Sequence, residues 1–525
     1  MGIDIDGLIG FLSDPKSYPH ENAGVELVQT HASVIAIGND LVYKVKKPVN
    51  FEFMDFSTLE KRKFYCDEEV RLNRRLTYDI YLGIVPIYLS DQGVLTFENK
   101  GVIVDYAVKM RRMKDAGFLS NLVEGELVEE RHFQSIIDRL CSFYNSLGPQ
   151  DLNAQYGTPD SIAYIINENT QVRREYLNKT LDPFQEELIS GYQQQFLIDK
   201  RRFLEDRVFQ GWVKDTHGDL RLEHFYFENE GVEVFDCIEF KERLRVNDLV
   251  NDYGFLCMEL DYAGYARESD QIYSELIKCT GDRFDEELLT FYKTHRACVR
   301  GMVHAVAAYA REVTPEDQLR NNRISRKFFG LATRYVMLKD RPTVFAIYGG
   351  VATGKSTLSG KLAEILDIPH IQSDATRKEI AGLKVDEYPD DETRERLYTK
   401  EMTKRTYGEV IRKGQQLIEQ HRAVILDGRW SKDDQKQMLI EAYPNARIFW
   451  IQTVAPLEER EKRLKEREKN KSISDARLNI FKKLLKDETY GEGNSQALQV
   501  DSSQTIGDCV KEVFRHLEQF GREPS

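Results

Sequence analysis

Apolar and polar positions follow two different patterns along the chain, and the change comes near residue 340. Before it, Ser33 to Ile37 and Leu41 to Lys47 alternate in the manner of half-buried strands. Between these runs, Gly38-Asn39-Asp40 supplies residues that tolerate the positive φ of a tight turn. The pattern therefore predicts a β-hairpin.

A helix and further strands are predicted to follow this hairpin. Residues 57–77 place apolar side chains at helical spacing among many charges. Strand-like runs come next, at Leu82 to Tyr88, Val94 to Phe97 and Gly101 to Met110. From about residue 118, apolar residues recur at helical spacing over long segments. We expect a two-lobed α+β domain over residues 1–340, with a small sheet lobe at about 1–113 and a large helical lobe at about 114–340.

Beyond Pro342, apolar runs alternate with amphipathic segments. Four runs are apolar enough to be central strands, namely Thr343 to Tyr348, His370 to Ser373, Ala423 to Asp427 and Arg447 to Thr453. The segments between them are long enough for the crossover helices that parallel strands require. Residues 341–525 are therefore predicted to form an α/β domain with a parallel sheet.

Composition and charge exclude several classes of function. The 525 residues carry a formal net charge of -13, which argues against a general nucleic-acid coat, because such binding relies on Lys and Arg neutralising phosphates. The sequence has no run of about 18 uncharged apolar residues and no secretory signal, so we expect a cytoplasmic protein without a membrane span. The seven cysteines are scattered without a C-x-x-C pair, which predicts reduced, mostly buried thiols and no zinc site.

The stretch GGVATGKST is the strongest chemical signal. It matches G-x-x-x-x-G-K-[ST], follows a predicted strand and opens a predicted helix. In such a loop, backbone N–H groups point at phosphate oxygens, the lysine adds positive charge at the β and γ phosphates, and the hydroxyl ligates Mg²⁺. We expect ATP, or GTP, to bind here with Mg²⁺ on Ser356. The residues of this predicted site are Gly349, Gly350, Val351, Ala352, Thr353, Gly354, Lys355, Ser356 and Thr357.

Companion residues of the loop favour phosphoryl transfer over binding alone. Asp374 follows the second predicted strand, where a carboxylate can accept a proton from an attacking hydroxyl. Arg377, three residues later on a predicted helix, can hold an anionic acceptor. Asp427 ends the third predicted strand and is suited to orient Mg²⁺. Arg463 and Arg467 share a helix face before a polar NKS segment, which predicts lid arginines that neutralise charge on the transferred phosphoryl group.

The set GGVATGKST, SDATRK, VILDGRW and RLKERE resembles AAA-type P-loop kinases that phosphorylate small molecules or nucleic-acid ends, of the polynucleotide-kinase and zeta-toxin kind. The resemblance covers about residues 343–500. Within it, Asp374 matches the hydroxyl-activating carboxylate and Arg377 the clamp on an acceptor phosphate. The resemblance thus implies a kinase with an alcohol group as acceptor.

A second signal lies in THGDLRLEHFYF, from Thr216 to Phe227, followed by VEVFDCIEF, from Val232 to Phe240. Its aspartates, Asp219 and Asp236, stand on either side of a short hairpin-like segment. Phosphoryl transfer needs one carboxylate to accept the acceptor's hydroxyl proton and another to hold Mg²⁺ on the nucleotide. We expect this spacing to deliver both carboxylates to one site.

His217-Gly218-Asp219 resembles the catalytic loop of aminoglycoside phosphotransferases and related kinase-like enzymes, and Asp236 corresponds to their metal-binding aspartate. The resemblance makes Asp219 the base. It also implies an ATP-phosphate lysine on a strand of the sheet lobe and a glutamate partner on the following helix. The preferred residues are Lys44 and Glu69, with Lys46 and Glu68 as the alternatives on the same strand face and the same helix.

Two departures from this family concern the N-terminal site. Such loops usually carry an asparagine, a second metal ligand, five residues beyond the catalytic aspartate, but this chain has His224 there. Neutral imidazole is a poor ligand for Mg²⁺, which prefers oxygen. The sheet lobe also lacks a G-x-G-x-x-G loop. A slow site, a one-metal site and a nucleotide-binding or regulatory module all stay open as interpretations.

Over nearly its full length the chain resembles two-domain bacterial proteins described as bifunctional aminoglycoside phosphotransferase-like and ATP-binding kinases. We predict an ATP- and Mg²⁺-dependent phosphotransferase with two candidate active sites, acting on a hydroxyl of a small molecule or a nucleic-acid end. One alternative is a single-site P-loop kinase regulated by a degenerate kinase-like N-terminal domain. Another is a non-enzymatic, nucleotide-gated interaction module. Fold kinship does not identify an antibiotic as the substrate.

Overall fold

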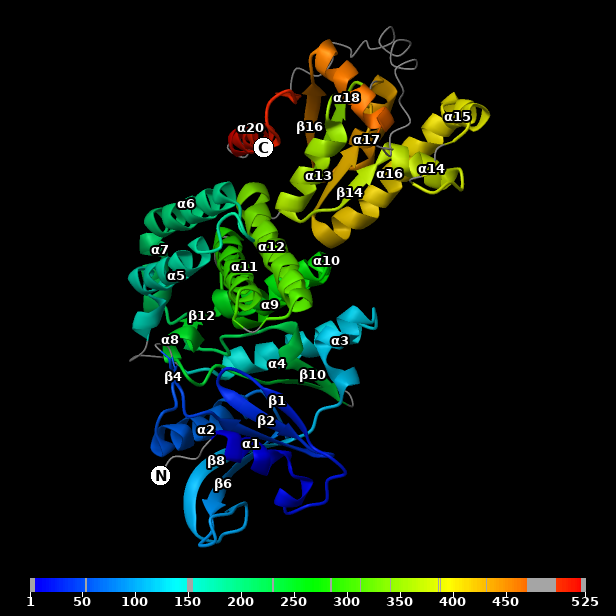
Figure 1. Ribbon diagram of the computed structural model, residues 1–525. Helices are drawn as coiled ribbons and strands as arrows, with labels where there is room; N and C mark the ends of the chain where they lie inside the picture. Colours follow the sequence, from blue (N-terminus) through cyan, green and yellow to red (C-terminus); the bar gives the residue numbers. More distant parts are fainter. Residues whose placement is uncertain are drawn as a thin grey trace. The chain divides into compact units, whose positions relative to one another are not determined.

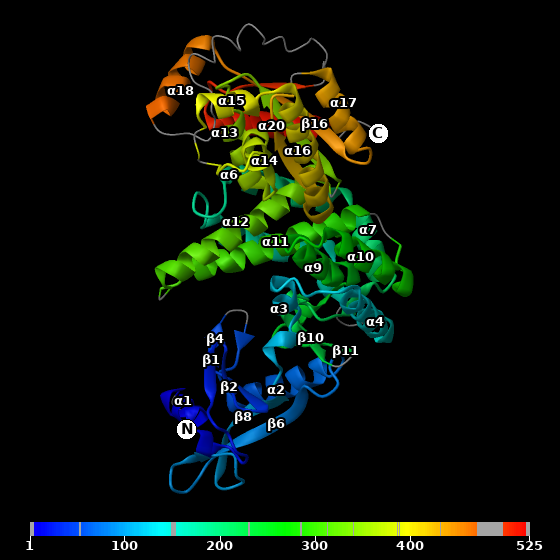
Figure 2. The same ribbon diagram turned by 90° about the vertical axis from the view of Figure 1, so that its right-hand side faces the viewer.

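The computed structural model describes residues 5–51, 54–148, 154–228, 231–283, 286–311, 313–339, 341–385, 387, 389–430, 432–469 and 497–520. The chain forms two compact units, whose elements are coloured along the sequence in Figures 1 and 2. Unit 1 comprises Met1–Ala163, Lys200–Glu259 and Glu268–Phe284, and unit 2 comprises Tyr164–Asp199, Leu260–Arg267 and Asp285–Ser525. Unit 2 thus groups several helices with the α/β part, and a domain boundary near residue 340 stays a prediction.

Unit 1 begins with a six-stranded antiparallel sheet. Its strands in spatial order are β1 (Glu26–Gln29), β2 (Ser33–Ile37), β3 (Leu41–Lys46), β8 (Val102–Arg111), β6 (Tyr81–Leu89) and β7 (Leu95–Thr96). The register pairs Lys44 with Ile35 on β2 and with Val108 on β8. The predicted hairpin and the three later strands of this lobe are confirmed, and Lys44 lies on a central strand.

Two helices cover opposite faces of this sheet. Helix α1 (Ile5–Ser13) packs Leu8 and Leu12 on the face that contains Val34, Ala36, Tyr43 and Val45. Helix α2 (Leu59–Asn73) packs Cys66 and Val70 on the other face. The hydroxyl of Thr58 caps α2 by accepting from Lys61 N at 3.3 Å. Because Glu69 shares the helix face of Cys66 and Val70, it is buried toward the sheet.

The rest of unit 1 is mainly helical and carries the HGD loop. Its elements include α3 (Leu119–Glu124), α4 (Glu130–Ser146), α7 (Arg201–Phe209), β9 (Val213–Asp215), η4 (Leu222–His224), β10 (Phe225–Glu228), β11 (Gly231–Val234), α8 (Glu242–Arg245), β12 (Val246–Asp248), most of α9 (Leu249–Tyr262) and most of α10 (Ala266–Thr280). Strand β9 pairs with β12 and β10 pairs with β11, both antiparallel. The HGD loop follows β9 directly.

A disulfide joins two helices of unit 1. Cys141 on α4 and Cys279 on α10 have sulfur atoms 2.00 Å apart and Cα atoms 5.9 Å apart. The prediction of reduced thiols is therefore wrong for this pair. The fold brings these helices side by side, and Asn145 Nδ2 also donates to Cys279 O at 3.2 Å. Because the two cysteines are 138 positions apart in the sequence, their spacing could not predict the pairing. The free cysteines are buried, as predicted; they are Cys66, Cys237, Cys257, Cys298 and Cys509.

Unit 2 contains long helices before its sheet. They include α6 (Pro183–Asp199), α11 (Glu286–Ala308), α12 (Pro315–Leu338) and most of α5 (Pro159–Arg174). Thr314 caps α12 and Pro315 occupies its first turn, a favoured start for a helix. Helices α11 and α12 form a long hairpin, drawn in green in Figure 2, in which Ser325 Oγ donates to Gly301 O at 2.8 Å. Among the described helices, none has the length and apolar character to cross a membrane.

A five-stranded parallel sheet forms the α/β part of unit 2. Its strands in spatial order are β14 (His370–Gln372), β15 (Ala423–Asp427), β13 (Thr343–Gly349), β16 (Arg447–Val454) and β17 (Leu498–Asp501). All four neighbouring pairs are parallel, which confirms the predicted architecture. Strand β17 was not predicted, because a four-residue run at the sheet edge has little periodicity.

Helices cover both faces of this sheet (Figure 1). On β13, Phe345 and Ile347 pack against α13 (Lys355–Leu366) and α20 (Ile506–Phe520). Val344 and Ala346 face the other way, toward α16 (Lys400–His421) and α17 (Asp433–Ala442). This arrangement leaves the carboxyl ends of the strands for the loops, which is where open α/β sheets bind ligands.

Candidate active sites

The loop between β13 and α13 has the backbone of a phosphate-binding loop. Gly349 and Gly354 take positive φ angles of 152° and 84°, and Ala352 takes 60°. A Cβ atom at Gly349 would collide with the carbonyl oxygen of Thr453, so the position requires glycine. The loop leads into the N-terminus of a 12-residue helix, where free N–H groups and the helix dipole favour an anion.

Lys355 and Ser356 begin this helix and contact polar groups of the loop and of β15. Lys355 Nζ donates to Gly350 O at 2.8 Å, which folds the ammonium group back over the loop. Ser356 Oγ donates to Asp427 Oδ2 at 2.7 Å. Asp427 is buried at the carboxyl end of β15, 71 positions from Ser356. Two neighbouring parallel strands thus bring the predicted metal-binding hydroxyl and carboxylate together.

This pair suits a magnesium ion chemically. Mg²⁺ prefers oxygen ligands and usually takes one or two protein groups together with substrate phosphates and water. Ser356 and Asp427 supply two such oxygens, and His370 Nε2 lies 3.5 Å from the same Asp427 oxygen. Across the described ranges, no group of three or more His, Cys, Asp or Glu side chains could hold a metal. Ser356 and Asp427 are thus the two side-chain oxygens at this loop that could hold such an ion.

Asp374 and Arg377 lie together on α14 (Ser373–Ile380), which starts directly after β14. Arg377 Nη1 donates to Asp374 Oδ1 at 3.0 Å, and its guanidinium carbon lies 4.7 Å from the ring centroid of Tyr398. The arginine is buried, whereas the side chain of Asp374 is 41% exposed. The carboxylate is therefore oriented by the arginine and open to solvent, as a proton acceptor for an incoming hydroxyl must be.

Arg463, on α18 (Leu457–Lys469), holds the backbone of the phosphate loop. Its Nη1 donates to Ala352 O at 3.3 Å and to Ser502 Oγ at 3.0 Å, and its Nη2 donates to Ser502 O at 2.6 Å. The hydroxyl of Ser502 donates to Thr353 O at 2.7 Å. The lid role of Arg463 stays a prediction. The side chain of Arg467 and the predicted NKS hinge lie outside the described residues.

Sequence reasoning missed a second arginine at this loop. Arg460 is buried and its Nε donates to Val351 O at 2.8 Å. Together with Arg463 it satisfies carbonyl groups of the loop and so helps to fix the loop's backbone. The available signal was the i,i+3 spacing of Arg460 and Arg463, which places both on one helix face.

The segment after Asp427 is strained, and sequence reasoning missed this too. Trp430 is fully buried at a positive φ of 37°, a conformation that is rare for a bulky residue. The hydroxyl of Tyr407 accepts from the backbone N–H of Arg429 at 3.0 Å and from that of Trp430 at 3.4 Å. Strained backbone of this kind is concentrated at functional sites, and here it adjoins the candidate metal ligand.

In unit 1, Lys44, Glu69 and Asp236 form a connected group of ion pairs. Lys44 Nζ lies 2.8 Å from Glu69 Oε1 and 3.1 Å from Asp236 Oδ1. Lys46 Nζ lies 2.7 Å from Glu69 Oε2 and also contacts Glu239. The two lysines point the same way from β3, because residues two apart on a strand share a face. Each lysine therefore takes one oxygen of the buried Glu69.

The geometry separates the preferred residues from the alternatives. Glu68 forms two hydrogen bonds with Arg71, at 2.8 and 2.7 Å, on the exposed side of α2. Lys44 reaches Asp236, whereas Lys46 reaches Glu239. Desolvation lowers the pKa of Lys44, but the charges of Asp236 and Glu69 outweigh it and hold that pKa well above its usual value. Lys44 is thus a charged lysine beside the predicted metal ligand.

A buried carboxylate that sequence reasoning missed holds the HGD loop. Asp252, on α9, accepts from His217 N at 3.2 Å, from Gly218 N at 2.7 Å and from Tyr144 Oη at 3.0 Å. Burial lowers the pKa of His217 to about 4, so the ring is neutral, and its Nε2 donates to Phe235 O at 2.9 Å. The loop is therefore fixed from both sides. Asp252 belongs to no motif, and its burial follows only from the fold.

Asp219 and Asp236 face one imidazole ring. His224 Nδ1 lies 2.8 Å from Asp219 O and 3.5 Å from Asp219 Oδ2, and its Nε2 lies 3.5 Å from Asp236 Oδ2. Asp236 takes a positive φ of 61°, a strained conformation of the kind found at ligand sites. Although desolvation raises the pKa of Asp236, the charge of Lys44 brings it below its usual value. The structure thus brings the two predicted carboxylates together.

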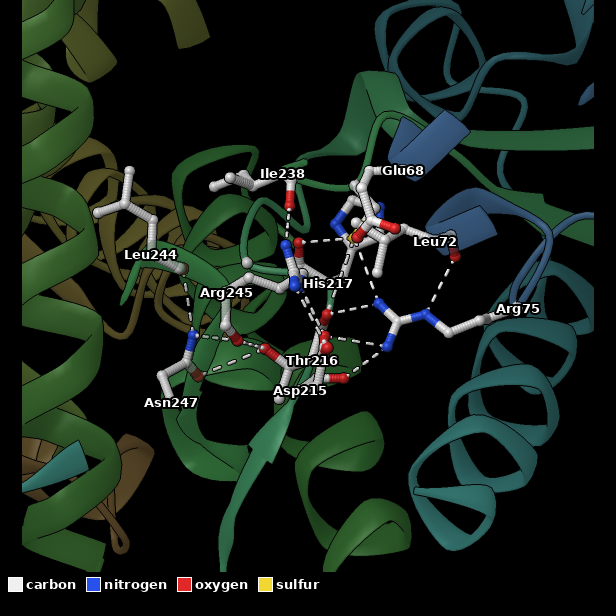
Figure 3. A network of polar contacts seen from close by, with 12 residues as sticks. Glu68, Leu72, Arg75, Asp215, Thr216, His217, Ile238, Leu244, Arg245 and Asn247 are labelled. Carbon is white, nitrogen blue, oxygen red and sulfur yellow. Dashed lines mark hydrogen bonds and ion pairs between the residues drawn. The ribbon is translucent and has the colours of Figure 1, made fainter. Parts of the chain in front are cut away.

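Contacts of Arg75, just after α2, and of Arg245, on α8, hold the segment that leads into the HGD loop (Figure 3). Arg75 donates to Asp215 O at 2.7 Å and to Thr216 O at 2.9 Å. Arg245 donates to Asp215 Oδ1 at 2.6 Å and to Ile238 O at 2.8 Å, and the hydroxyl of Thr216 donates to Arg245 O at 2.7 Å. In Figure 3 these side chains enclose the backbone just before His217. These contacts therefore fix the backbone that leads into the HGD loop.

Comparison with known proteins gives a family for the C-terminal region. Residues 344–487 match the family model described as an AAA domain. The predicted relationship to AAA-type P-loop proteins is confirmed for this region. Uncharacterized proteins of Mycobacterium tuberculosis and Mycobacterium bovis are 28% identical to this chain over 407 residues, which is 77% of this chain and 78% of each relative.

Solved structures of other proteins are similar to a share of the chain. A gluconokinase from Sinorhizobium meliloti is 18% identical, covers 34% of this chain and 93% of its own, and has a TM-score of 0.26. A spectinomycin phosphotransferase, solved with ADP and spectinomycin, is 11% identical, covers 63% of this chain and 98% of its own, and has a TM-score of 0.34. The match to the AAA-domain model and the five-stranded parallel sheet agree for the C-terminal region, as predicted.

Proposed function

We propose that this protein is an ATP- and Mg²⁺-dependent phosphotransferase that moves the γ-phosphoryl group to a hydroxyl of a small molecule or of a nucleic-acid end. One observation supports this above the others. Ser356 Oγ and Asp427 Oδ2 lie 2.7 Å apart directly beside a phosphate-binding loop. A hydroxyl and a carboxylate placed in this way are the protein groups that position a magnesium–triphosphate complex for transfer.

The P-loop site has a residue for each requirement of the reaction. Lys355 binds the β and γ phosphates, and Ser356 with Asp427 holds Mg²⁺, which neutralises charge on the phosphates when it is bound. Asp374 accepts the proton of the attacking hydroxyl, and Arg377 keeps that carboxylate in place and holds an anionic group of the acceptor. Arg463 and Arg467 keep the lid role that the sequence predicts.

The N-terminal site is the second candidate active site. Asp219 serves as the base and Asp236 as the metal ligand, while Lys44 with Glu69 clamps the nucleotide phosphates. The ion pairs of Lys44 with Glu69 and with Asp236 support this assignment. His224 between the two aspartates favours one alternative, in which the site binds nucleotide without transferring phosphate and regulates the P-loop kinase.

A transfer screen tests the proposal. The intact protein and two variants, Lys355→Ala and Asp219→Asn, are incubated with γ-labelled ATP and with pooled metabolites, aminoglycosides or 5′-hydroxyl oligonucleotides. Lys355→Ala should abolish labelling of one class of acceptor but leave some nucleotide turnover. Asp219→Asn should remove that remaining turnover. Matched controls are Lys361→Ala, which pairs with Glu364 on the same helix as Lys355, and Asp160→Asn, which pairs with Arg201 on the surface of unit 1.

The outcomes separate the hypotheses. If neither Lys355→Ala nor Asp219→Asn changed nucleotide turnover, the two-site scheme would be wrong. Turnover that depends on Lys355 alone, with nucleotide still bound in unit 1, would support the regulatory alternative. Transfer of label to any acceptor would count against a purely non-enzymatic, nucleotide-gated module.

A further inference from the structure

Both ring nitrogens of His224 are already engaged. Arginine can only donate, so the 3.1 Å contact from Arg221 Nη2 makes His224 Nε2 an acceptor. The other nitrogen, Nδ1, then carries the proton and donates it to Asp219 O at 2.8 Å. One neutral tautomer satisfies both contacts. The ring therefore links Arg221 to the backbone of the proposed base and offers neither nitrogen to a metal ion.

Arg221 lies among the acidic groups of the same site. Its Nε is 3.4 Å from Asp219 Oδ2, and its Nη2 is 2.9 Å from Glu223 Oε1. Desolvation lowers the pKa of Arg221, but the neighbouring carboxylates, Asp219 foremost, outweigh it and raise that pKa. The side chain is 25% exposed, so its remaining N–H groups can reach a ligand. A permanent positive charge thus stands beside the proposed base.

A second divalent cation does not fit this arrangement. In kinase-like catalytic loops an asparagine oxygen binds the second ion, but His224 holds that position here and is hydrogen-bonded to a guanidinium. Mg²⁺ prefers oxygen ligands, and a cation on this side of the site would be repelled by Arg221. Asp236 has a carboxylate with free acceptor capacity, which suits one ion.

We propose that the N-terminal site binds a nucleoside triphosphate with a single divalent cation on Asp236, and that the guanidinium of Arg221 supplies to the phosphates the charge that a second cation supplies in related enzymes. This inference rests on the proposed nucleotide binding of unit 1. A planar guanidinium with several N–H donors matches phosphate oxygens geometrically. His224 acts as a positioning residue, because it ties Arg221 to the backbone of Asp219.

The first test counts metal ions. In the full chain, Lys355→Ala and Ser356→Ala together disable the P-loop site. Mn²⁺ is then titrated by electron paramagnetic resonance in the presence of a non-hydrolysable ATP analogue. One Mn²⁺ per bound analogue is expected. His224→Asn combined with Arg221→Gln offers an amide oxygen and removes the repelling charge, so this double variant should bind two. Two ions in the parent protein, or one in the double variant, would overturn the proposal.

The second test measures affinity for the analogue in the same background. Arg221→Gln should weaken binding by roughly 10- to 100-fold, the range for a lost hydrogen bond to a charged group. Arg221→Lys should restore part of the loss, because it keeps the charge without the planar fork. Arg71→Gln is the matched control, since Arg71 is exposed and pairs with Glu68.

Two failures can be told apart in this experiment. Unchanged affinity in the Arg221→Gln variant overturns the role of the arginine and leaves nucleotide binding in place. Absence of analogue binding by the parent protein instead overturns the proposed function of the N-terminal site, and the present inference with it. A circular dichroism spectrum like that of the parent shows that a variant is folded.

Discussion

Replacing Asp252 with alanine should loosen the HGD loop without disturbing unit 2. The side chain is 0% exposed and accepts from two backbone N–H groups, those of His217 and Gly218, and from the hydroxyl of Tyr144. Each buried donor left without a partner costs roughly 1–3 kcal/mol. Because such costs are not additive, we expect the local opening free energy to fall by about 3–5 kcal/mol.

Hydrogen exchange measured by mass spectrometry reads this change directly. A peptide that contains the amides of His217 and Gly218 should exchange roughly 100- to 4,000-fold faster in Asp252→Ala, since about 1.4 kcal/mol corresponds to a factor of ten. Tyr144→Phe removes one donor of the three and leaves both backbone contacts. It should accelerate exchange only about 2- to 10-fold, from a net loss of roughly 0.5–1.5 kcal/mol.

Two results would refute this reasoning. Unchanged exchange at His217 and Gly218 would show that Asp252 does not hold the loop. Equal acceleration in β13 of unit 2 would show that the substitution destabilises the whole chain and not the loop. Nucleotide turnover that depends on Asp219 should disappear in Asp252→Ala, because the loop that carries this carboxylate is no longer fixed.

Other predictions concern the P-loop metal pair, the disulfide and acid stability. Asp427→Asn should raise the Mg²⁺ concentration needed for half-maximal transfer by roughly 10- to 100-fold, the range for a lost partner in a metal shell, and initial rates measured against Mg²⁺ check this. Cys141→Ser should destabilise unit 1 by about 2–4 kcal/mol in denaturant unfolding, and an unchanged midpoint would contradict this. The pKa of His217 falls from 6.5 to about 4 on folding, so the unfolded chain takes up the proton first as the pH drops. Stability from this group is complete above pH 6.5 and is lost toward pH 4, which thermal unfolding across this range measures.

The phosphate loop could be predicted because its chemistry is local. Its glycines, Lys355 and Ser356 lie within nine consecutive residues, so spacing alone specifies the turn and the start of the helix. Most strands of both sheets were also predictable, since their apolar runs and alternation are properties of short segments, but the short edge strands β1 and β17 were not. For the same reason the HGD loop was recognised from its own residues and from its likeness to a family.

Contacts between distant segments could not be predicted in this way. Asp252 lies 34 positions from Gly218, and Cys141 and Cys279 are 138 positions apart. No periodicity records such pairs, because they depend on how whole helices pack. That Glu69 and not Glu68 pairs with Lys44 likewise depends on which side of α2 faces the sheet.

The sequence by itself therefore predicted most of the elements, the phosphate loop and the aspartates of both candidate sites, because each depends on neighbours along the chain. The tertiary structure decided which side chains contact these aspartates and this loop. It placed Ser356 on Asp427, His224 between Asp219 and Asp236, and Arg221 beside the proposed base. Burial and long-range hydrogen bonds exist only after the segments pack, so these contacts follow from packing and not from spacing.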